Sequence, residues 1–245
     1  MIRWLVLFLV FAGPATAQET SLRPVARPEQ QVAEPEADEN TASDSAVATS
    51  LRPQPRTAAV AQAAETARVA RVKGQICGDP DLQGDVLGTV AGRGACGVEN
   101  AVRVKSVAGI RFPANPTMNC ETAIALKIWV QRGAIPQVGG EGGGIRSIRT
   151  ASDYACRNRN NQSGEKLSEH AQGRAIDIAG IKLNSGREIT VLQGWGSGDD
   201  GKQLRGMWQA ACGPFGTVLG PEANRYHRDH FHFDTASYRS GPYCR

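Results

Sequence analysis

Residues 227–234 read His-Arg-Asp-His-Phe-His-Phe-Asp, and this stretch decides the fold. Side chains alternate between the two faces of a β-strand, so a strand here directs His230, His232 and Asp234 to one face. The two phenylalanines between them then point into a core. Three of the four histidines of the chain lie in these eight residues, which predicts a polar site on one face of a sheet.

The fourth histidine, His170, lies in residues 168–178, which read Ser-Glu-His-Ala-Gln-Gly-Arg-Ala-Ile-Asp-Ile. A glycine turn leads there into an alternating run with Asp177 between two isoleucines, a pattern typical of a strand. A hairpin-like return can bring His170 and Asp177 together. With His232 they form a set of two imidazoles and a carboxylate, which binds zinc and leaves one position for water. The alternative is that these histidines are ordinary surface and loop residues.

Two motifs resemble those of the D-alanyl-D-alanine type of zinc peptidase, the LAS superfamily, which also includes lysostaphin-like enzymes and the Hedgehog amino-terminal domain. They are Ser-x-His-x-x-Gly-x-Ala-x-Asp at residues 168–177 and Asp-x-x-His at residues 229–232. A closer resemblance, to the bacterial extensin-like C-terminal domain, covers roughly residues 74 to 245. It is carried by residues 168–180, 211–221 and 227–234. It implies an α+β fold of the LAS peptidase type, an antiparallel sheet with a helix packed on it.

The same resemblance implies catalytic roles beside the metal ligands. In those peptidases an acidic residue three positions before the last ligand histidine takes a proton from water, and Asp229 holds that position before His232. Asp229 is therefore the expected base, with an ion pair to Arg228 as its alternative role. His230, on the same face as His232, is expected to stabilise the tetrahedral intermediate or to orient Asp229.

Three further side chains are candidates for the site. Residues 148–152 resemble a segment in which the peptidases carry an arginine that binds the oxyanion or carboxylate of the substrate, and Arg149 matches it best. A solvated arginine on a strand is the alternative. Asp234 either accepts the second imidazole N–H of a ligand histidine or forms an ordinary cross-strand pair. His227 is either a reserve base or a loop residue.

The chain has three predicted parts. Residues 1–17 contain Arg3, an apolar run and Ala-Thr-Ala, the order of a secretory signal peptide, so we expect a periplasmic protein with no membrane anchor after cleavage. Residues 18–72 hold five prolines and no glycine or aromatic residue, which predicts a disordered linker that is a candidate binding segment for another envelope protein. Its alanine-rich end, residues 57–72, is a candidate helix. Residues 73–245 form the predicted domain.

All six cysteines lie in this domain, at positions 77, 96, 120, 156, 212 and 244. An even number in an exported chain predicts three disulfides. Sequence alone cannot choose among the fifteen pairings that six cysteines allow. We expect Cys77–Cys96, Cys120–Cys156 and Cys212–Cys244, which leaves His and Asp to bind metal.

The predicted secondary structure is α+β. One helix is expected from Thr117 to Arg132, with a stripe at Cys120, Ile124 and Ile128 packed on the sheet and Gly133 just past its end. A second is expected from Asp199 or Asp200 to Ala211. Seven strands are expected, at residues 101–104, 110–112, 145–150, 175–178, 189–192, 217–219 and 230–234.

The charge of the domain, 21 basic against 16 acidic residues, favours anionic partners such as wall peptides. Export and the scattering of the basic residues argue against nucleic acid. The chain has no Gly-x-Ser-x-Gly, His-Glu-x-x-His or phosphate-loop motif. The expected function is therefore an exported zinc metallopeptidase that cleaves peptidoglycan stem or cross-bridge peptides, as a D,D-endopeptidase or carboxypeptidase. The alternative is a non-catalytic, zinc-stabilised wall-binding or signalling module.

Overall fold

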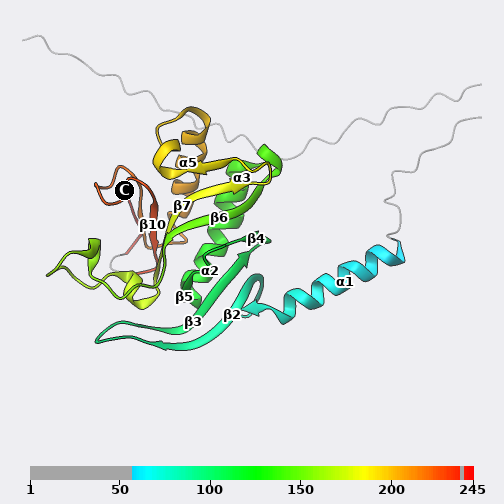
Figure 1. Cartoon of the computed structure of the whole chain (residues 1–245), viewed down its shortest axis with the longest axis horizontal. Coiled ribbons are helices and arrows are strands. Elements are labelled where there is room, and N and C mark those ends of the chain that lie inside the picture. The colour runs from blue at the N-terminus through cyan, green and yellow to red at the C-terminus, as the bar shows by residue number, and fades with distance from the viewer. Residues whose placement is uncertain (1–56, 238–239) are drawn as a thin grey trace, which may run out of the picture. The chain divides into compact units, whose positions relative to one another are not determined.

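The computed structural model describes residues 57–237 and 240–245 (Figure 1). The predicted signal peptide and residues 18–56 of the predicted linker lie outside the described residues. The end of the predicted linker is helix α1, Ala58–Lys73, as its alanine content predicted. Thr57 begins the helix, because its side chain accepts a hydrogen bond from the backbone N–H of Val60. None of the residues of α1 is buried. No described helix is both long and apolar enough to span a bilayer.

A mixed sheet is the centre of the fold, with strand order β1-β2-β3-β4-β6-β7-β10-β9-β11, and with β5 on β3 and β8 on β7. The strands are β1 Gln75–Ile76, β2 Asp79–Ala91, β3 Gly97–Val107, β4 Ile110–Arg111, β5 Thr117–Asn119, β6 Ile145–Ser152, β7 Ala175–Leu183, β8 Glu188–Thr190, β9 Thr217–Leu219, β10 Phe231–Asp234 and β11 Tyr243–Cys244. Most pairs are antiparallel, as expected, but β4–β6 and β9–β11 are parallel.

Six of the seven predicted strands coincide with or lie on β3, β4, β6, β7, β9 and β10. The prediction of the seventh strand, at residues 189–192, was wrong for residues 191 and 192. Thr190 caps a short helix there, α4 Val191–Gly194, by accepting a hydrogen bond from the backbone N–H of Gln193. The long strand β2 was not predicted, because its glycines and charged residues break the alternation that identifies a strand.

The first predicted helix is helical only from Cys120, so the expected start at Thr117 was wrong. Residues 117–119 pair with β3 as β5, and Asn119 caps α2, Cys120–Trp129, by accepting a hydrogen bond from Thr122 N–H at 2.8 Å. The helix does not end at Gly133. A π-helical turn, Val130–Ala134, joins it to α3, Ile135–Val138.

The expected buried stripe of this helix was also wrong, because Ile124 is 39% exposed. The buried face of α2 consists of Thr122, Ala123, Ala125, Leu126 and Trp129. Gly133 serves close packing: a Cβ atom there would lie 2.8 Å from the Cβ of Ala210 on α5, Gly198–Ala211. The second predicted helix, α5, is confirmed within two residues.

The core lies between the sheet and α2, α3 and α5, which stand behind the strands in Figure 1. Trp129 of α2 donates a hydrogen bond from Nε1 to the carbonyl of Met207 on α5 at 2.8 Å, and its ring packs edge-on against Phe233. Phe231 and Phe233 are at most 1% exposed. The two phenylalanines of β10 therefore point into the core, as the alternation predicted.

The six cysteines form Cys77–Cys120, Cys96–Cys156 and Cys212–Cys244. Only the last pair was predicted correctly. Cys77 and Cys96 cannot pair because they lie at opposite ends of β2, whose 13 residues are about 43 Å long when extended. Cys77 instead meets the start of α2, and Cys96, at the tip of the β2–β3 hairpin, fastens the loop that contains Cys156. Three disulfides are consistent with an exported protein.

Candidate metal centre

Two neighbouring strands place Asp177 and His232 opposite each other. In the antiparallel pair β7–β10, Asp177 is the register partner of His232, so both side chains leave the sheet on the same face. Each lies between core residues of its strand, which fixes that face as the one away from α2. His232 Nδ1 lies 2.9 Å from Asp177 Oδ1.

His170 comes from a 3-10 turn, Glu169–Gln172, that precedes β7. The turn ends at Gly173, where φ is +63° and a Cβ atom would lie 2.5 Å from Val98, so only glycine fits. His170 is 1% exposed and donates a hydrogen bond from Nδ1 to the carbonyl of Asp153 at 2.7 Å. Its other nitrogen, Nε2, is left to face Asp177 and His232.

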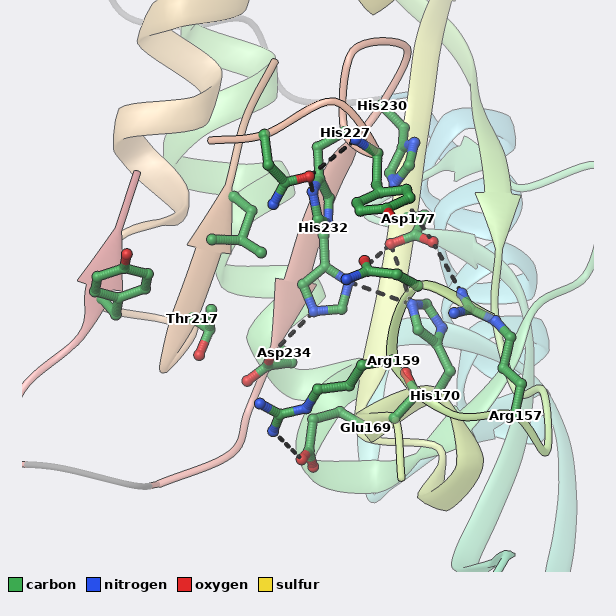
Figure 2. A pocket seen from close by; sticks show the side chains of 16 residues that line it. Arg157, Arg159, Glu169, His170, Asp177, Thr217, His227, His230, His232 and Asp234 are labelled. Atoms are coloured by element: carbon green, nitrogen blue, oxygen red, sulfur yellow. Dashed lines mark hydrogen bonds and ion pairs between the residues drawn. The ribbon is translucent and has the colours of Figure 1, made fainter. Parts of the chain in front are cut away.

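The three predicted ligands converge on one point, as Figure 2 shows. His170 Nε2 lies 3.2 Å from Asp177 Oδ1 and 3.2 Å from His232 Nδ1. Four ligands at the zinc distances of 2.0–2.2 Å form a tetrahedron with edges of about 3.3–3.6 Å. The three donor atoms therefore need to move apart by only a few tenths of an ångström to hold zinc. All cysteines are in disulfides, so no thiolate competes.

Asp234 orients His232. The Nε2–H group of His232 donates a hydrogen bond to Asp234 Oδ2 at 3.0 Å, which directs Nδ1 toward Asp177 and His170. The second carboxylate oxygen of Asp234 accepts a hydrogen bond from the backbone N–H of Ala236. Of the two roles considered for Asp234, the structure has the contact with the ligand histidine.

In the metal-free protein, Asp177 and His232 each stabilise the charged form of the other. Burial alone raises the pKa of Asp177, but hydrogen bonds and attraction from His170 and His232 outweigh it and hold that pKa well below its ordinary value. Burial lowers the pKa of His232, yet Asp177 and Asp234 raise it to about 9. A proton on His232 thus supplies positive charge beside Asp177, and a metal ion bound here would have to displace it.

His230 connects Asp229 to the cluster. Its Nδ1–H group donates to Asp229 Oδ1 at 2.8 Å, so Nε2 carries a lone pair, and Nε2 lies 3.7 Å from Asp177 Oδ2. The side chain of Asp229 is 63% exposed and does not line the pocket. We expected His230 to orient Asp229. In the structure His230 is the residue that lines the pocket, and the hydrogen bond to Asp229 orients its ring.

His227 belongs to the pocket, although it is also a loop residue. Its Nδ1–H group donates to Asn224 Oδ1 at 2.8 Å, so its Nε2 is an acceptor. Burial and the neighbouring His232 lower the pKa of His227 to about 4, which keeps the ring neutral at pH 7. Its ring centre lies 5.2 Å from that of His230 and 5.8 Å from that of His232.

A pocket of about 450 Å³ opens over the three ligands. Arg149 is not among its lining residues, because it pairs with Glu188 at 2.7 Å on the open face of the sheet. Arg157 and Arg159 enter the pocket instead (Figure 2). Arg157 Nη2 lies 3.8 Å from Asp177 Oδ2.

Sequence reasoning missed both of these arginines. They lie in a loop whose path is set by the Cys96–Cys156 disulfide, and only the neighbouring Cys156 marks them in the sequence. The glutamate before His170 was missed as well. Glu169 is 6% exposed and binds Arg174, with Arg159 Nη2 at 3.6 Å from its carboxylate.

The family model for the Extensin-like protein C-terminus matches residues 85–245. This range covers β3 to β11, most of β2 and every side chain of the metal centre. No significant match is found among curated proteins or among solved structures.

Proposed function

The chain belongs to the Extensin-like protein C-terminus family, and we propose that it is an exported, periplasmic zinc metallopeptidase that cleaves peptidoglycan peptides as a D,D-endopeptidase or carboxypeptidase. The proposal includes a fold of the LAS peptidase type. The observation that carries it is the convergence of His170 Nε2, Asp177 Oδ1 and His232 Nδ1 at the base of an open pocket. Three protein ligands beside open space are the arrangement of catalytic rather than structural zinc sites.

His170, Asp177 and His232 would hold the zinc ion, which would supply polarisation of a peptide carbonyl and a lowered pKa, about 7, for a bound water. His230 is placed to receive the proton of the attacking water, because Asp229 fixes its tautomer and leaves Nε2 as an acceptor toward the cluster. Asp229 acts in this scheme as a positioning residue. Asp229 does not line the pocket, so in this scheme it does not contact the substrate, which differs from the role that resemblance assigned to it.

Arg157 fits the role expected of Arg149. Its guanidinium lies at the edge of the ligand cluster and its side chain is 27% exposed, so it can reach a substrate while bound to the protein. The planar fork of arginine suits an oxyanion or a carboxylate. His227, neutral and an acceptor at Nε2, can bind an N–H group of the substrate.

The rival function, a zinc-stabilised wall-binding or signalling module, is favoured by one observation. Asp229, the acidic residue expected to act as base, lies outside the pocket. A module without turnover needs no base in contact with substrate. The two functions therefore differ in the role of His230.

Digestion of purified sacculi separates them. The zinc-loaded chain should release muropeptides whose masses identify the cleaved bond, and the His170→Ala variant should release none. His230→Ala should keep zinc and lose turnover. Tight binding of the zinc-loaded chain to sacculi with every muropeptide uncut would reject the peptidase and favour the module.

A further inference from the structure

The face of the sheet that holds the proposed metal centre continues across β6, β4 and β3, and none of the described helices covers it there. In Figure 1, α2 and α3 stand behind these strands. Directly paired residues lead across this face from β3 to β8. They are Ser106, Arg111, Ser147, Lys182 and Glu188. Paired residues of adjacent strands point to the same face, so these five side chains lie side by side across the sheet.

Three cations on this face are defined here as the cationic row: Arg103, Arg111 and Lys182. Each lies between two core residues of its own stretch of chain, so its side chain points away from the core. The flanking residues are Val102 and Val104, Ile110 and Phe112, and Ile181 and Leu183. Asp177 lies between Ile176 and Ile178 in the same way, which places the metal centre on the same face.

The cationic row is exposed and has no ion-pair partner among the described residues. The other cations nearby differ. Lys105 pairs with Asp85 at 2.6 Å, and Arg149 pairs with Glu188 at 2.7 Å. Asp85 and Glu188, the register partners of Arg103 and Lys182, are therefore bound by other cations, and the row keeps its positive charge for a ligand.

The row begins within reach of a chain that occupies the pocket. Lys182 follows Asp177 on β7 by five residues, about 17 Å along an extended strand. Arg111 lies two strands away from β7, about 10 Å across the sheet. A polymer that leaves the pocket along the open face meets Lys182 and then Arg111.

We propose that the cationic row binds a carboxylate-bearing stretch of the same polymer whose peptide enters the metal centre. This inference rests on the proposed function and extends it with a second contact region for the substrate. Half-buried Ser106, the register partner of Arg111, offers a hydroxyl group to amides and sugars. A lipid surface fits less well, because none of the large apolar side chains exposed among the described residues lies in this row.

The test compares two triple variants that remove the same charge. One is Arg103→Gln/Arg111→Gln/Lys182→Gln. The control replaces three exposed cations outside the row, Arg93, Arg132 and Lys73, by glutamine. Binding of the zinc-loaded chain to purified sacculi is measured on ice by co-sedimentation over a series of salt concentrations.

The row variant should bind about threefold to tenfold more weakly at low salt, since each exposed ion contact contributes little and is screened. Its salt dependence should be shallower than that of the unmodified chain, and the control should bind like the unmodified chain. Amidation of the carboxylates of the sacculi should weaken binding of the unmodified chain to the level of the row variant. Turnover of a short soluble muropeptide should stay the same in both variants.

Equal binding by the row variant and the unmodified chain would overturn the inference, as would an equal loss in the control. Binding to phosphatidylglycerol vesicles that depends on the row, with sacculus binding unchanged, would replace the polymer by a membrane. Sacculi bound through the row yet never cut would reject the peptidase and leave the binding surface in place. The two proposals thus fail by different results.

Discussion

The two faces of the strand pair β7–β10 differ in what holds them together. On one face, Phe231 and Phe233 are buried against Trp129 and the rest of the apolar core. On the other, Asp177 is buried and His232 is partly buried, and both contact other polar groups. Apolar contacts are non-directional and tolerate exchange of similar shapes, whereas buried polar groups need each partner in place. The first face accounts for the fold, and the second carries the proposed metal centre.

The largest effect on stability is expected from a substitution on the apolar face alone. Phe233→Ala removes a fully buried ring and should lower the free energy of unfolding by about 3–5 kcal/mol. Chemical denaturation measures this loss. Phe233→Leu is the control and should cost clearly less, because it leaves a smaller cavity. Both variants should still bind one zinc ion per folded chain. Loss of zinc from folded Phe233→Leu would show that the two faces are not independent.

A second change acts on the polar face without touching a ligand. Asp229→Asn keeps the shape of the side chain but no longer favours the His230 tautomer with the proton on Nδ1. Turnover of sacculi should fall on the order of a hundredfold, with zinc content and stability unchanged. His230→Ala should lose at least as much. If Asp229→Asn cleaves at the normal rate, the base lies elsewhere, and His227 is the next candidate.

The polar face was the more predictable of the two, in the sense that the three residues chosen as candidate ligands do lie together. Their identity and the alternation of β10 are local features, so His170, Asp177 and His232 could be chosen from sequence and resemblance together. The α2 face could not be predicted from its isoleucines, because the pairing of residues 117–119 with β3 shifts the start of the helix. The disulfide pairs could not be predicted for a related reason, because the partners of Cys77 and Cys96 depend on the length of the β2–β3 hairpin.

The arginines of the pocket show the same limit. Arg149 lies on a strand and was chosen by resemblance, but its register places it beside Glu188. Arg157 reaches the pocket from a loop that Cys96–Cys156 fastens to the tip of a distant hairpin and that backbone hydrogen bonds join to residues 166–168. No local pattern contains that information.

A smaller effect is expected where the polar face supports a ligand indirectly. Asp234→Asn retains an acceptor for His232 Nε2–H but removes the negative charge that strengthens the imidazole as a ligand. Zinc affinity should fall about tenfold to a hundredfold, as measured by competition with a chelating dye. Thr217→Ala, a change at another pocket residue that forms no hydrogen bond with His232, is the control. Equal affinity in Asp234→Asn and the unmodified chain would contradict this role.

The smallest effect is a pH dependence of the metal-free domain. His232 has a pKa raised from 6.5 to about 9, so its stabilising contribution is complete below about pH 6.5 and is lost as the pH rises through about 9. The depressed pKa of Asp177 adds stability that is present above about pH 4 and is lost in acid. Thermal unfolding of the chelated domain should therefore show a falling melting temperature between pH 6.5 and 10. His232→Ala should flatten that limb, and an unchanged slope would contradict the assignment.

The central claim is that the polar face of β7–β10 is a zinc centre of three protein ligands, and zinc titration of the chelated chain by calorimetry tests it most directly. The account predicts one zinc ion per unmodified chain, with protons released on binding. His170→Ala, Asp177→Ala and His232→Ala should each lose more than about a hundredfold in affinity while the folded chain remains, because no spare ligand exists. Full zinc occupancy in all three variants would contradict the account.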